Sequence, residues 1–469
     1  MNKFMKFIPF FAAPTIALAL LPALSHAAGM EYPDNGTIAI GRGGAWAANP
    51  SDGLAFQYNP AGLAQQRGLH LYLDGRLTQE NLRFASSTKD ALPVENSGPL
   101  FLGPSGAVVW GMGPMGPLSD LAFALGATGP SAIGKTNFPE SGAQRYAITN
   151  TDYFIAYFSG AVAGAYKDWL RFGITGQMIQ ANAKFGQHVW SPPEGDTYED
   201  GKHPPEFTTY DAIATFSGQS GFVPSFVAGL TIIPHADWAI GVSFRPHVHF
   251  DAPGKLVIDL PEYAAKGGVK VEGDSANLRL DLSDTLRTGV QWQATPTLQL
   301  ELDGVVERWS RLQTIQIINN NIMVGYPNGM VKIDDIIFQK QFVDAYSLRL
   351  GGDFYALPDR LKLRAGYIFE TSAINKPFVS IDFANWQRHV ASAGLSVRLF
   401  GAWLDLAYAH HFVAQQVVTD SQVVSQVGAT LPGFVAPVAS PIGNGTYDAS
   451  LNIFSMSLRI PFGDVNGRL

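Results

Sequence analysis

Apolar and polar residues alternate with a period of two along most of the chain, and this pattern restricts the possible folds more than any other sequence feature. In the runs at 170–178, 238–245 and 454–462, large apolar residues are interleaved with Arg, Ser, Thr, Gln, Ala or Gly. Because successive side chains of a strand point to opposite faces, each run predicts a strand with one apolar face and one polar or small face. We therefore expect an all-β protein.

Strand length and loop length distinguish a membrane barrel from a soluble β-sandwich, which also alternates. The expected strands are ~10 residues or longer, as a tilted membrane crossing requires, whereas strands of soluble sheets average ~5–6. Short connections also alternate with long ones, as in outer-membrane barrels, whose closure leaves no unpaired sheet edge in lipid. The short ones lie near 166–168, 233–237, 294–297, 356–359 and 400–401, and the long ones near 188–220, 251–284, 309–343, 371–387 and 417–447.

Counting the runs predicts a 14-stranded antiparallel transmembrane β-barrel, and bacterial single-chain barrels have an even number of strands. The expected strands are 68–79, 105–113, 119–128, 149–165, 169–187, 221–232, 238–250, 285–293, 298–308, 344–355, 360–370, 388–399, 402–416 and 448–462. Tryptophans near the strand ends predict an aromatic girdle at the membrane interfaces; these are Trp169, Trp190, Trp238, Trp292, Trp309, Trp386 and Trp403.

Composition excludes several other classes of protein. The chain has no Cys, which excludes a disulfide scaffold, a Cys-ligated zinc site and a thiol nucleophile. A net charge of −7 argues against nucleic acid as the main partner. The paired histidines at 247 and 249, and at 410 and 411, have no evident third metal ligand. We expect no metal, no cofactor and no catalytic residue, so the protein is not expected to be an enzyme.

The N-terminus has the features of an export signal. Lys3 and Lys6 are followed by an apolar segment at 7–24, and small residues at Ser25 and Ala27 provide a cleavage site. We therefore expect residues 1–27 to be a signal peptide rather than a retained anchor. Export, together with the predicted barrel, places the mature protein in the outer membrane of a bacterium.

Residues 28–67 differ from the rest of the chain. They are rich in Gly and Ala, lack alternation and are too short for a separate domain, which usually has ~50 residues or more. A barrel of this size has a lumen, so we expect residues 28–67 to form a hatch, or plug, inside it, and residues 68–469 to form the barrel with long extracellular loops. The alternative is a disordered periplasmic tail, but Trp46, Phe56 and Tyr58 argue against it.

Three motifs in this segment resemble the hatch of FadL-type outer-membrane transporters: IGRGGA at 40–45, DGLA at 52–55 and NPAGL at 59–63. Segments resembling later strands of the family follow in the same order at 309–312, 338–340, 344–346 and 363–366. The resemblance spans nearly the whole mature chain. The family carries long-chain fatty acids, and some relatives carry aromatic hydrocarbons.

The resemblance implies passive, gated transport. Substrate is caught among the outer loops, enters a pocket above the hatch, and leaves sideways into the membrane through the third strand when the hatch moves. The residues implied in gating are Gly41, Arg42, Gly43, Asn59, Pro60 and Ala61. At the third strand, Gly126, Gly129 and Pro130 mark the lateral opening, because glycine permits a bulge and proline cannot donate a ladder hydrogen bond. An ordinary strand end at a turn is the alternative there.

Recognition of a fatty acid requires a cation or well-placed donors for its carboxylate. By resemblance, Asn182, Lys184 and Lys340 occupy the relevant positions, and Asn182 replaces a residue that is basic in fatty-acid carriers. This departure leaves neutral hydrocarbons open as cargo, and both lysines have a solvated or lipopolysaccharide-facing role as the alternative. The lumen-facing arginines are expected to pair across strands with Asp303, Asp353, Glu370 and Asp405 instead of holding substrate.

The predicted function is outer-membrane transport of hydrophobic compounds, with long-chain fatty acids first and neutral or aromatic hydrocarbons as the alternative. The expected partners are the hydrophobic substrate, membrane lipid and lipopolysaccharide, and we expect a monomer. A hydrophilic diffusion porin would need a charged constriction loop and no N-terminal plug. A lipid hydrolase would need a Ser/His constellation on the barrel wall.

Overall fold

The computed structural model describes residues 35–88, 90–129, 134–191, 208–383, 386–426, 428 and 439–462. The expected signal peptide at 1–27 lies outside this part of the chain, as do the first residues of the expected hatch and Pro130. No helix within the described ranges is long and apolar enough to span a membrane.

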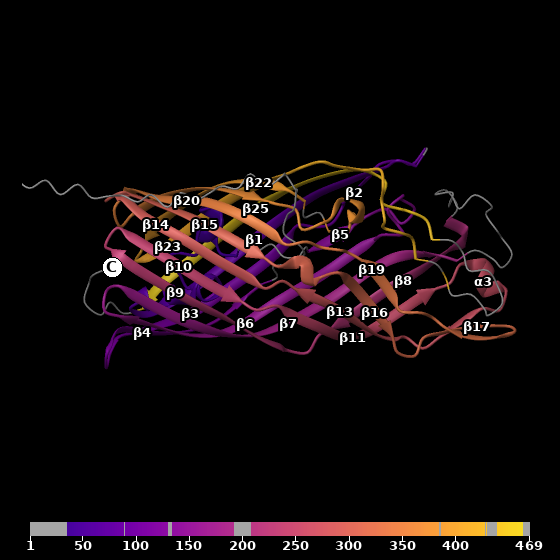
Figure 1. Cartoon of the computed structure of the whole chain (residues 1–469), viewed down its shortest axis with the longest axis horizontal. Coiled ribbons are helices and arrows are strands. Elements are labelled where there is room, and N and C mark those ends of the chain that lie inside the picture. Colours follow the sequence, from indigo (N-terminus) through magenta and orange to yellow (C-terminus); the bar gives the residue numbers. More distant parts are fainter. Residues whose placement is uncertain are drawn as a thin grey trace, which may run out of the picture.

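Fourteen antiparallel strands form a closed barrel, which confirms the predicted fold class (Figure 1). In order around the barrel they are β1 (Gly68–Ser86), β3 (Phe101–Met115), β4 (Leu118–Thr128), β6 (Asn150–Tyr166), β7 (Leu170–Trp190), β9 (Val223–His235), β10 (Trp238–Arg245), β14 (Thr285–Thr295), β15 (Leu298–Glu307), β20 (Ala345–Leu357), β21 (Leu361–Glu370), β22 (Arg388–Leu399), β23 (Ala402–Val413) and β25 (Gly445–Phe462). The last strand closes the barrel on the first, with pairing from Leu69↔Phe462 to Ser86↔Gly445.

The alternation seen in the sequence separates the outer face from the lumen. Large apolar side chains such as Leu73, Leu348 and Phe454 are exposed on the outside, where lipid would cover them. The predicted tryptophan girdle is partly wrong. Trp169, Trp238 and Trp292 are exposed, but Trp190, Trp309 and Trp386 are fully buried, and Trp309 and Trp386 belong to an apolar core.

The short connections lie together at one end of the barrel, at the left of Figure 1. Phe400 and Gly401 join β22 to β23 with φ of 50° and 86°. Positive φ at both positions is typical of a type I′ hairpin, whose twist matches that of the flanking strands. This end therefore has the tight turns that the sequence predicts.

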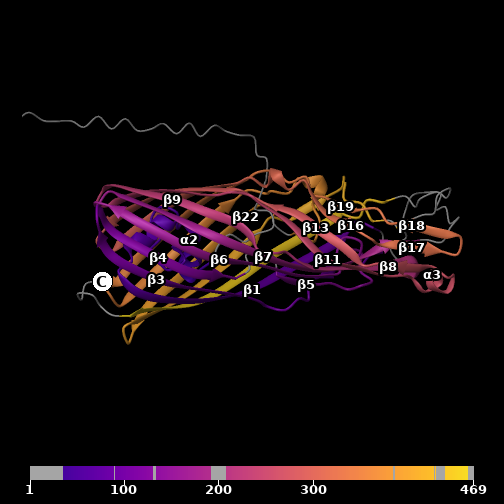
Figure 2. The same cartoon turned by 90° about the horizontal axis from the view of Figure 1, so that it is seen from below.

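The long connections form a second tier of sheet at the other end, at the right of Figures 1 and 2. The expected strand 238–250 is wrong, because β10 ends at Arg245 and a new strand begins at Val248, where it leaves the barrel wall and pairs with β8 and β13. Pro246 lies between the two strands and cannot donate to the ladder. The larger strands of this tier are β8 (Asp211–Gln219), β11 (Val248–Asp259), β13 (Ser275–Leu282), β16 (Thr314–Asn319) and β19 (Ile336–Gln339).

Shorter elements complete the connections. These are β2 (Val94–Glu95), β5 (Lys135–Asn137), β12 (Lys270–Glu272), β17 (Met323–Tyr326), β18 (Gly329–Lys332), β24 (Gln416–Val418), α3 (Glu262–Lys266), and single 3₁₀ turns at Thr208–Tyr210, Trp309–Arg311 and Lys376–Phe378.

Residues 35–67 lie inside the barrel, in the half that carries the short turns (Figure 2). They form α1 (Thr37–Gly41), α2 (Ala55–Tyr58) and a 3₁₀ helix, η1 (Pro60–Gln65). All of their side chains up to Ala64 are buried except those of Asn49 and Ser51. We call this described segment the hatch.

Candidate functional site

Arg42 fixes one side of the hatch to the barrel wall. Its guanidinium is fully buried, and Nη2 donates to Glu301 Oε2 at 2.7 Å. Nη1 donates to Asp353, and Nε donates to the Ala45 carbonyl oxygen at 3.0 Å. Charge-assisted hydrogen bonds of this kind are among the strongest in proteins. The anchor therefore joins the hatch to β15 and β20.

Carboxylates of β15 also bind the hatch backbone. Asp303 Oδ2 accepts hydrogen bonds from the amides of Trp46 at 2.7 Å and Ala47 at 2.8 Å, and Glu301 Oε1 accepts one from Ala48 at 2.8 Å. Asp303 thus binds the hatch, where we had expected it to pair with an arginine. The predicted cross-strand pairs do form between Arg364 and Asp353 at 2.6 Å, and between Arg459 and Asp405 at 2.8 Å.

Asn59 fixes the hatch to the other side of the barrel. Its Nδ2 donates to the Ala47 carbonyl at 2.8 Å and to Thr231 Oγ1 on β9 at 3.2 Å, while its Oδ1 accepts from the Ala61 amide at 3.1 Å. Asn59 caps η1, and Pro60 follows in the first turn, where its missing N–H costs nothing. The Asn-Pro-Ala motif therefore shapes and holds this part of the hatch.

A ring of barrel glycines lets the hatch approach the wall closely. An added Cβ at any of them would lie within 3.0 Å of a hatch atom: these are Gly111, Gly126, Gly173, Gly229, Gly241, Gly289, Gly351 and Gly366. Two neighbouring pairs lie directly opposite each other in the sheet, Gly173↔Gly229 against the Asn59 side and Gly351↔Gly366 against the Arg42 side. Within the hatch, Gly43 has φ of 61° and sits against the backbone of Tyr367 and Gly366. These glycines therefore allow the hatch backbone to lie directly against the barrel wall.

Replacing Asn59 by Ala should loosen the hatch locally. The variant loses the contacts to Ala47, Thr231 and Ala61, and an unpaired buried donor or acceptor costs about 1–3 kcal/mol. Hydrogen–deuterium exchange should become at least tenfold faster at residues 59–63. The exposed Asn81, which makes one outer-face bond to Ser450, provides the matched control Asn81→Ala. Unchanged exchange at 59–63 would contradict the anchoring role.

The proposed lateral opening lies next to the hatch. Gly126 faces α2, because a Cβ there would be 2.6 Å from the Phe56 ring. β4 pairs with β6 without interruption to Thr128↔Tyr157, and pairing with β6 resumes through β5 at Lys135↔Asp152. Gly129 packs against Pro104 of β3. The third strand therefore pairs continuously with β6 from Asp120 to Thr128, whereas its pairing with β3 has register shifts between Gly111 and Met115.

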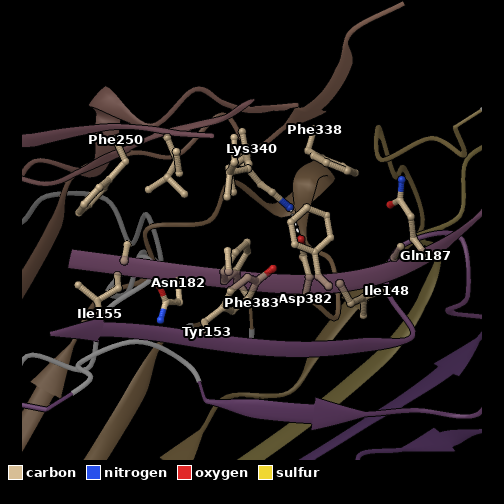
Figure 3. Close-up of a pocket in the computed structure, with 18 residues that line it drawn as sticks. Ile148, Tyr153, Ile155, Asn182, Gln187, Phe250, Phe338, Lys340, Asp382 and Phe383 are labelled. Atoms are coloured by element: carbon tan, nitrogen blue, oxygen red, sulfur yellow. Dashed lines mark hydrogen bonds and ion pairs between the residues drawn. The ribbon is translucent and has the colours of Figure 1, made fainter. Parts of the chain in front are cut away.

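An apolar pocket opens among the outer strands, between the barrel wall and the second tier (Figure 3). The space between its walls is about 770 Å³, part of it open to solvent. Its lining is Ala147, Ile148, Tyr153, Ile155, Ala181, Asn182, Ala183, Phe185, Gln187, Phe250, Ala252, Leu278, Leu280, Ile315, Phe338, Lys340, Asp382 and Phe383. Mostly apolar walls with a few polar groups are typical of small-molecule sites.

Lys340, which the resemblance suggests as a substrate ligand, lines this pocket, but its ammonium is already paired. Its ammonium donates to Asp382, and both side chains are largely buried. The ammonium also lies over the rings of Phe383 at 4.9 Å and Phe338 at 5.9 Å. Sequence analysis did not identify Asp382, because the sequence of a long loop does not predict which lysine an aspartate in it will contact.

The structure separates the other two predicted substrate ligands. Asn182 is an exposed residue that lines the pocket at the end away from Gln187 in Figure 3. Lys184 is exposed and does not line the pocket; it lies opposite Asp152 on the outer face of β6 and β7. Only Asn182 and Lys340 are therefore brought to the same site.

Gln187 is a further pocket residue that sequence analysis missed. A buried cluster follows it directly, in which Arg145, Tyr146 and His188 contact the Asp211 carboxylate at 2.6, 2.6 and 3.1 Å. Burial raises the pKa of Asp211, but hydrogen bonds from His188, Tyr146 and Arg145 outweigh burial and hold it below its usual value. The cluster fixes the end of β7, from which Gln187 lines the pocket.

A closed barrel with an apolar outer face, a plugged lumen and an apolar pocket defines an outer-membrane protein that transports hydrophobic compounds. The chain belongs to the family of outer membrane protein transport proteins (OMPP1/FadL/TodX), whose model matches residues 18–462. The resemblance that we drew from the hatch motifs is thereby confirmed.

Solved structures share the fold. A FadL homologue from Pseudomonas aeruginosa has a TM-score of 0.73 and 16% identity, covering 93% of this chain and 100% of that one. The toluene transporters TbuX from Ralstonia pickettii and TodX from P. putida each have a TM-score of 0.64 and 13% identity, covering 92% of this chain and 99% of theirs. No curated protein matches the sequence.

Proposed function

We propose that this protein takes up hydrophobic small molecules by passive, gated diffusion, with the pocket among the outer strands as the entry site. The apolar pocket is the main support for this proposal, because its walls would replace the water around an apolar cargo before the cargo reaches the hatch. Each methylene group kept out of water contributes about 0.8 kcal/mol. A water-filled pore would be a poor route for such a cargo.

We place the exit at the side of the barrel, beside the third strand. Tyr153 and Ile155 line the pocket and belong to the stretch of β6 that lies between its pairing with β4 and its pairing with β5. A cargo in the pocket is thus next to the wall segment where the described ladder changes partner. In this proposal the hatch residues Gly41, Arg42, Gly43, Asn59, Pro60 and Ala61 gate the route, and Gly126, Gly129 and Pro130 border the exit.

The family resemblance suggests two classes of cargo, long-chain fatty acids and neutral or aromatic hydrocarbons. Two of the structural neighbours are toluene transporters and one is a FadL homologue, so the fold is compatible with both classes. A hydrophilic porin is disfavoured by the buried, hydrogen-bonded hatch. Purified protein in planar bilayers should accordingly show no large steady conductance.

Blocking the pocket should stop uptake. Ala183→Trp places an indole in the pocket, and we expect uptake of toluene by proteoliposomes to fall at least tenfold. Ala391→Trp is the matched control, because Ala391 is exposed on the outer face and a tryptophan there faces lipid. If the pocket variant takes up toluene at the rate of the control, the entry site lies elsewhere.

A further inference from the structure

The polar groups of the pocket favour a third class of hydrophobic cargo, and this inference rests on the proposed function of the pocket as the entry site. We propose that the pocket selects uncharged hydrophobic molecules that carry a hydroxyl group, such as aliphatic alcohols or phenols, and excludes carboxylates. Asp382 and Gln187 determine this specificity. Three features of the pocket support the assignment.

The pocket has no spare positive charge for an anion. Lys340 is the one lysine or arginine among the lining residues, and its ammonium is taken by Asp382. The lysine and aspartate side chains are only 6% and 12% exposed. A carboxylate ligand would have to displace Asp382 or lie beside it, and either arrangement leaves a buried negative charge without a full partner, which is strongly unfavourable. The pair therefore repels fatty-acid anions.

The uncharged side-chain amide of Gln187 is available to hydrogen-bond a ligand. The residue is 1% exposed, and within the described chain neither its Nε2 nor its Oε1 has a hydrogen-bond partner. Buried polar groups are nearly always paired, and leaving one unpaired costs about 1–3 kcal/mol. A ligand hydroxyl can accept from Nε2 or donate to Oε1 and so remove this cost. A hydrocarbon can do neither.

Asp382 has an unused acceptor as well. Its Oδ1 is buried without a hydrogen-bond partner among the residues that the structure describes, while its Oδ2 holds Lys340. The free oxygen can accept from a donor but not from a carboxylate. A ligand hydroxyl can donate to Asp382, and a hydroxyl can also pair with either polar atom of Gln187, whereas a ketone or ester can only accept. The apolar body of the ligand would then lie against Phe185, Phe250 and Phe338.

A competition experiment tests the proposal. Purified protein in detergent is equilibrated at pH 8 with equal amounts of 1-dodecanol, dodecanoate and dodecane, and bound compounds are measured by mass spectrometry against Ala183→Trp as background. We expect dodecanol to be enriched at least tenfold over dodecanoate and several-fold over dodecane. Asp382→Asn frees a net positive charge at Lys340 and should raise dodecanoate enrichment at least tenfold. Gln187→Leu should lower dodecanol to the level of dodecane and leave dodecane unchanged.

The outcomes separate this inference from the proposed function. If wild-type protein enriches dodecanoate or dodecane as strongly as dodecanol, or if Asp382→Asn leaves dodecanoate unchanged, the hydroxyl specificity is wrong while the pocket remains the entry site. If no compound exceeds the Ala183→Trp background, the proposed entry site itself fails. Heat-modifiable migration checks that each variant folds, and Asp382→Ser replaces Asp382→Asn should that variant not fold.

Discussion

Replacing Gly366 by leucine should displace the hatch from the barrel wall and allow the closed barrel to conduct ions. An added Cβ at this position would lie 2.1 Å from the Arg42 carbonyl carbon and 2.1 Å from the Gly43 amide nitrogen. The wall cannot yield, because Gly366 is held between Gly351 of β20 and Ser392 of β22. The hatch backbone must therefore move, and with it the Arg42 contacts on the same side.

The measurement is single-channel conductance in planar bilayers. We expect the Gly366→Leu variant to conduct at least tenfold more than the parent protein while keeping heat-modifiable migration. Gly304→Leu is the control, because Gly304 lies on an outward-facing position where the nearest neighbour of an added Cβ, Thr288, is 3.8 Å away. A closed Gly366→Leu barrel would mean that the hatch adapts to the lost space, and the glycine ring would then not be needed for closure.

Replacing Arg42 by methionine should release the same part of the hatch without a steric clash. The change removes the cation that Glu301 and Asp353 share, and breaking one partner out of a buried ion pair costs about 3–5 kcal/mol. Asp353 keeps Arg364, but Glu301 loses its only cation within ion-pair distance in the described structure. We expect amide exchange at Trp46, Ala47 and Ala48 to accelerate by about 10²- to 10⁴-fold, because each 1.36 kcal/mol is a factor of ten.

An exposed ion pair provides the control for this prediction. Arg83 lies 3.5 Å from both Glu95 and Asp448, and its side chain is 45% exposed. Surface pairs contribute about 0–1 kcal/mol, so Arg83→Met should leave hatch exchange unchanged. The double variant Arg42→Met with Glu301→Gln should recover part of the loss, since it removes the unpaired carboxylate. If Arg42→Met behaves like Arg83→Met, the hatch is held by packing rather than by charge.

Much of the barrel could be predicted from local patterns. Period-two alternation is a property of each strand by itself, so strands such as 298–308 and 388–399 lie within about a residue of the observed β15 and β22. The second tier was not predicted. Its strands pair with one another far along the chain, as β11 does with β8, and alternation does not specify the partner. The strand predicted at 238–250 failed at Pro246 for the same reason, because one apolar pattern continues across two different sheets.

The residues of the candidate site also fall into two groups, those that the sequence suggested and those that it did not. Asn182 and Lys340 were found by their positions in a resembling family, and both line the pocket. Gln187 and Asp382 were not found, because their significance lies in what they contact or fail to contact. The tryptophans could not be sorted for the same reason. The sequence shows that Trp190 lies near a strand end, but its burial depends on how the loops fold over it.

The sequence by itself determined that this protein is a closed, apolar-faced barrel with an unusual N-terminal segment, because membrane solvation imposes a repeating pattern on every strand. Tertiary structure alone decided how the hatch is seated, through glycines and carboxylates that are distant in sequence and adjacent in space. It also decided the charge of the pocket. Lys340 and Asp382 are 42 residues apart, and their charges neutralise each other only because two loops come into contact. The periodicity of the sequence does not predict that contact.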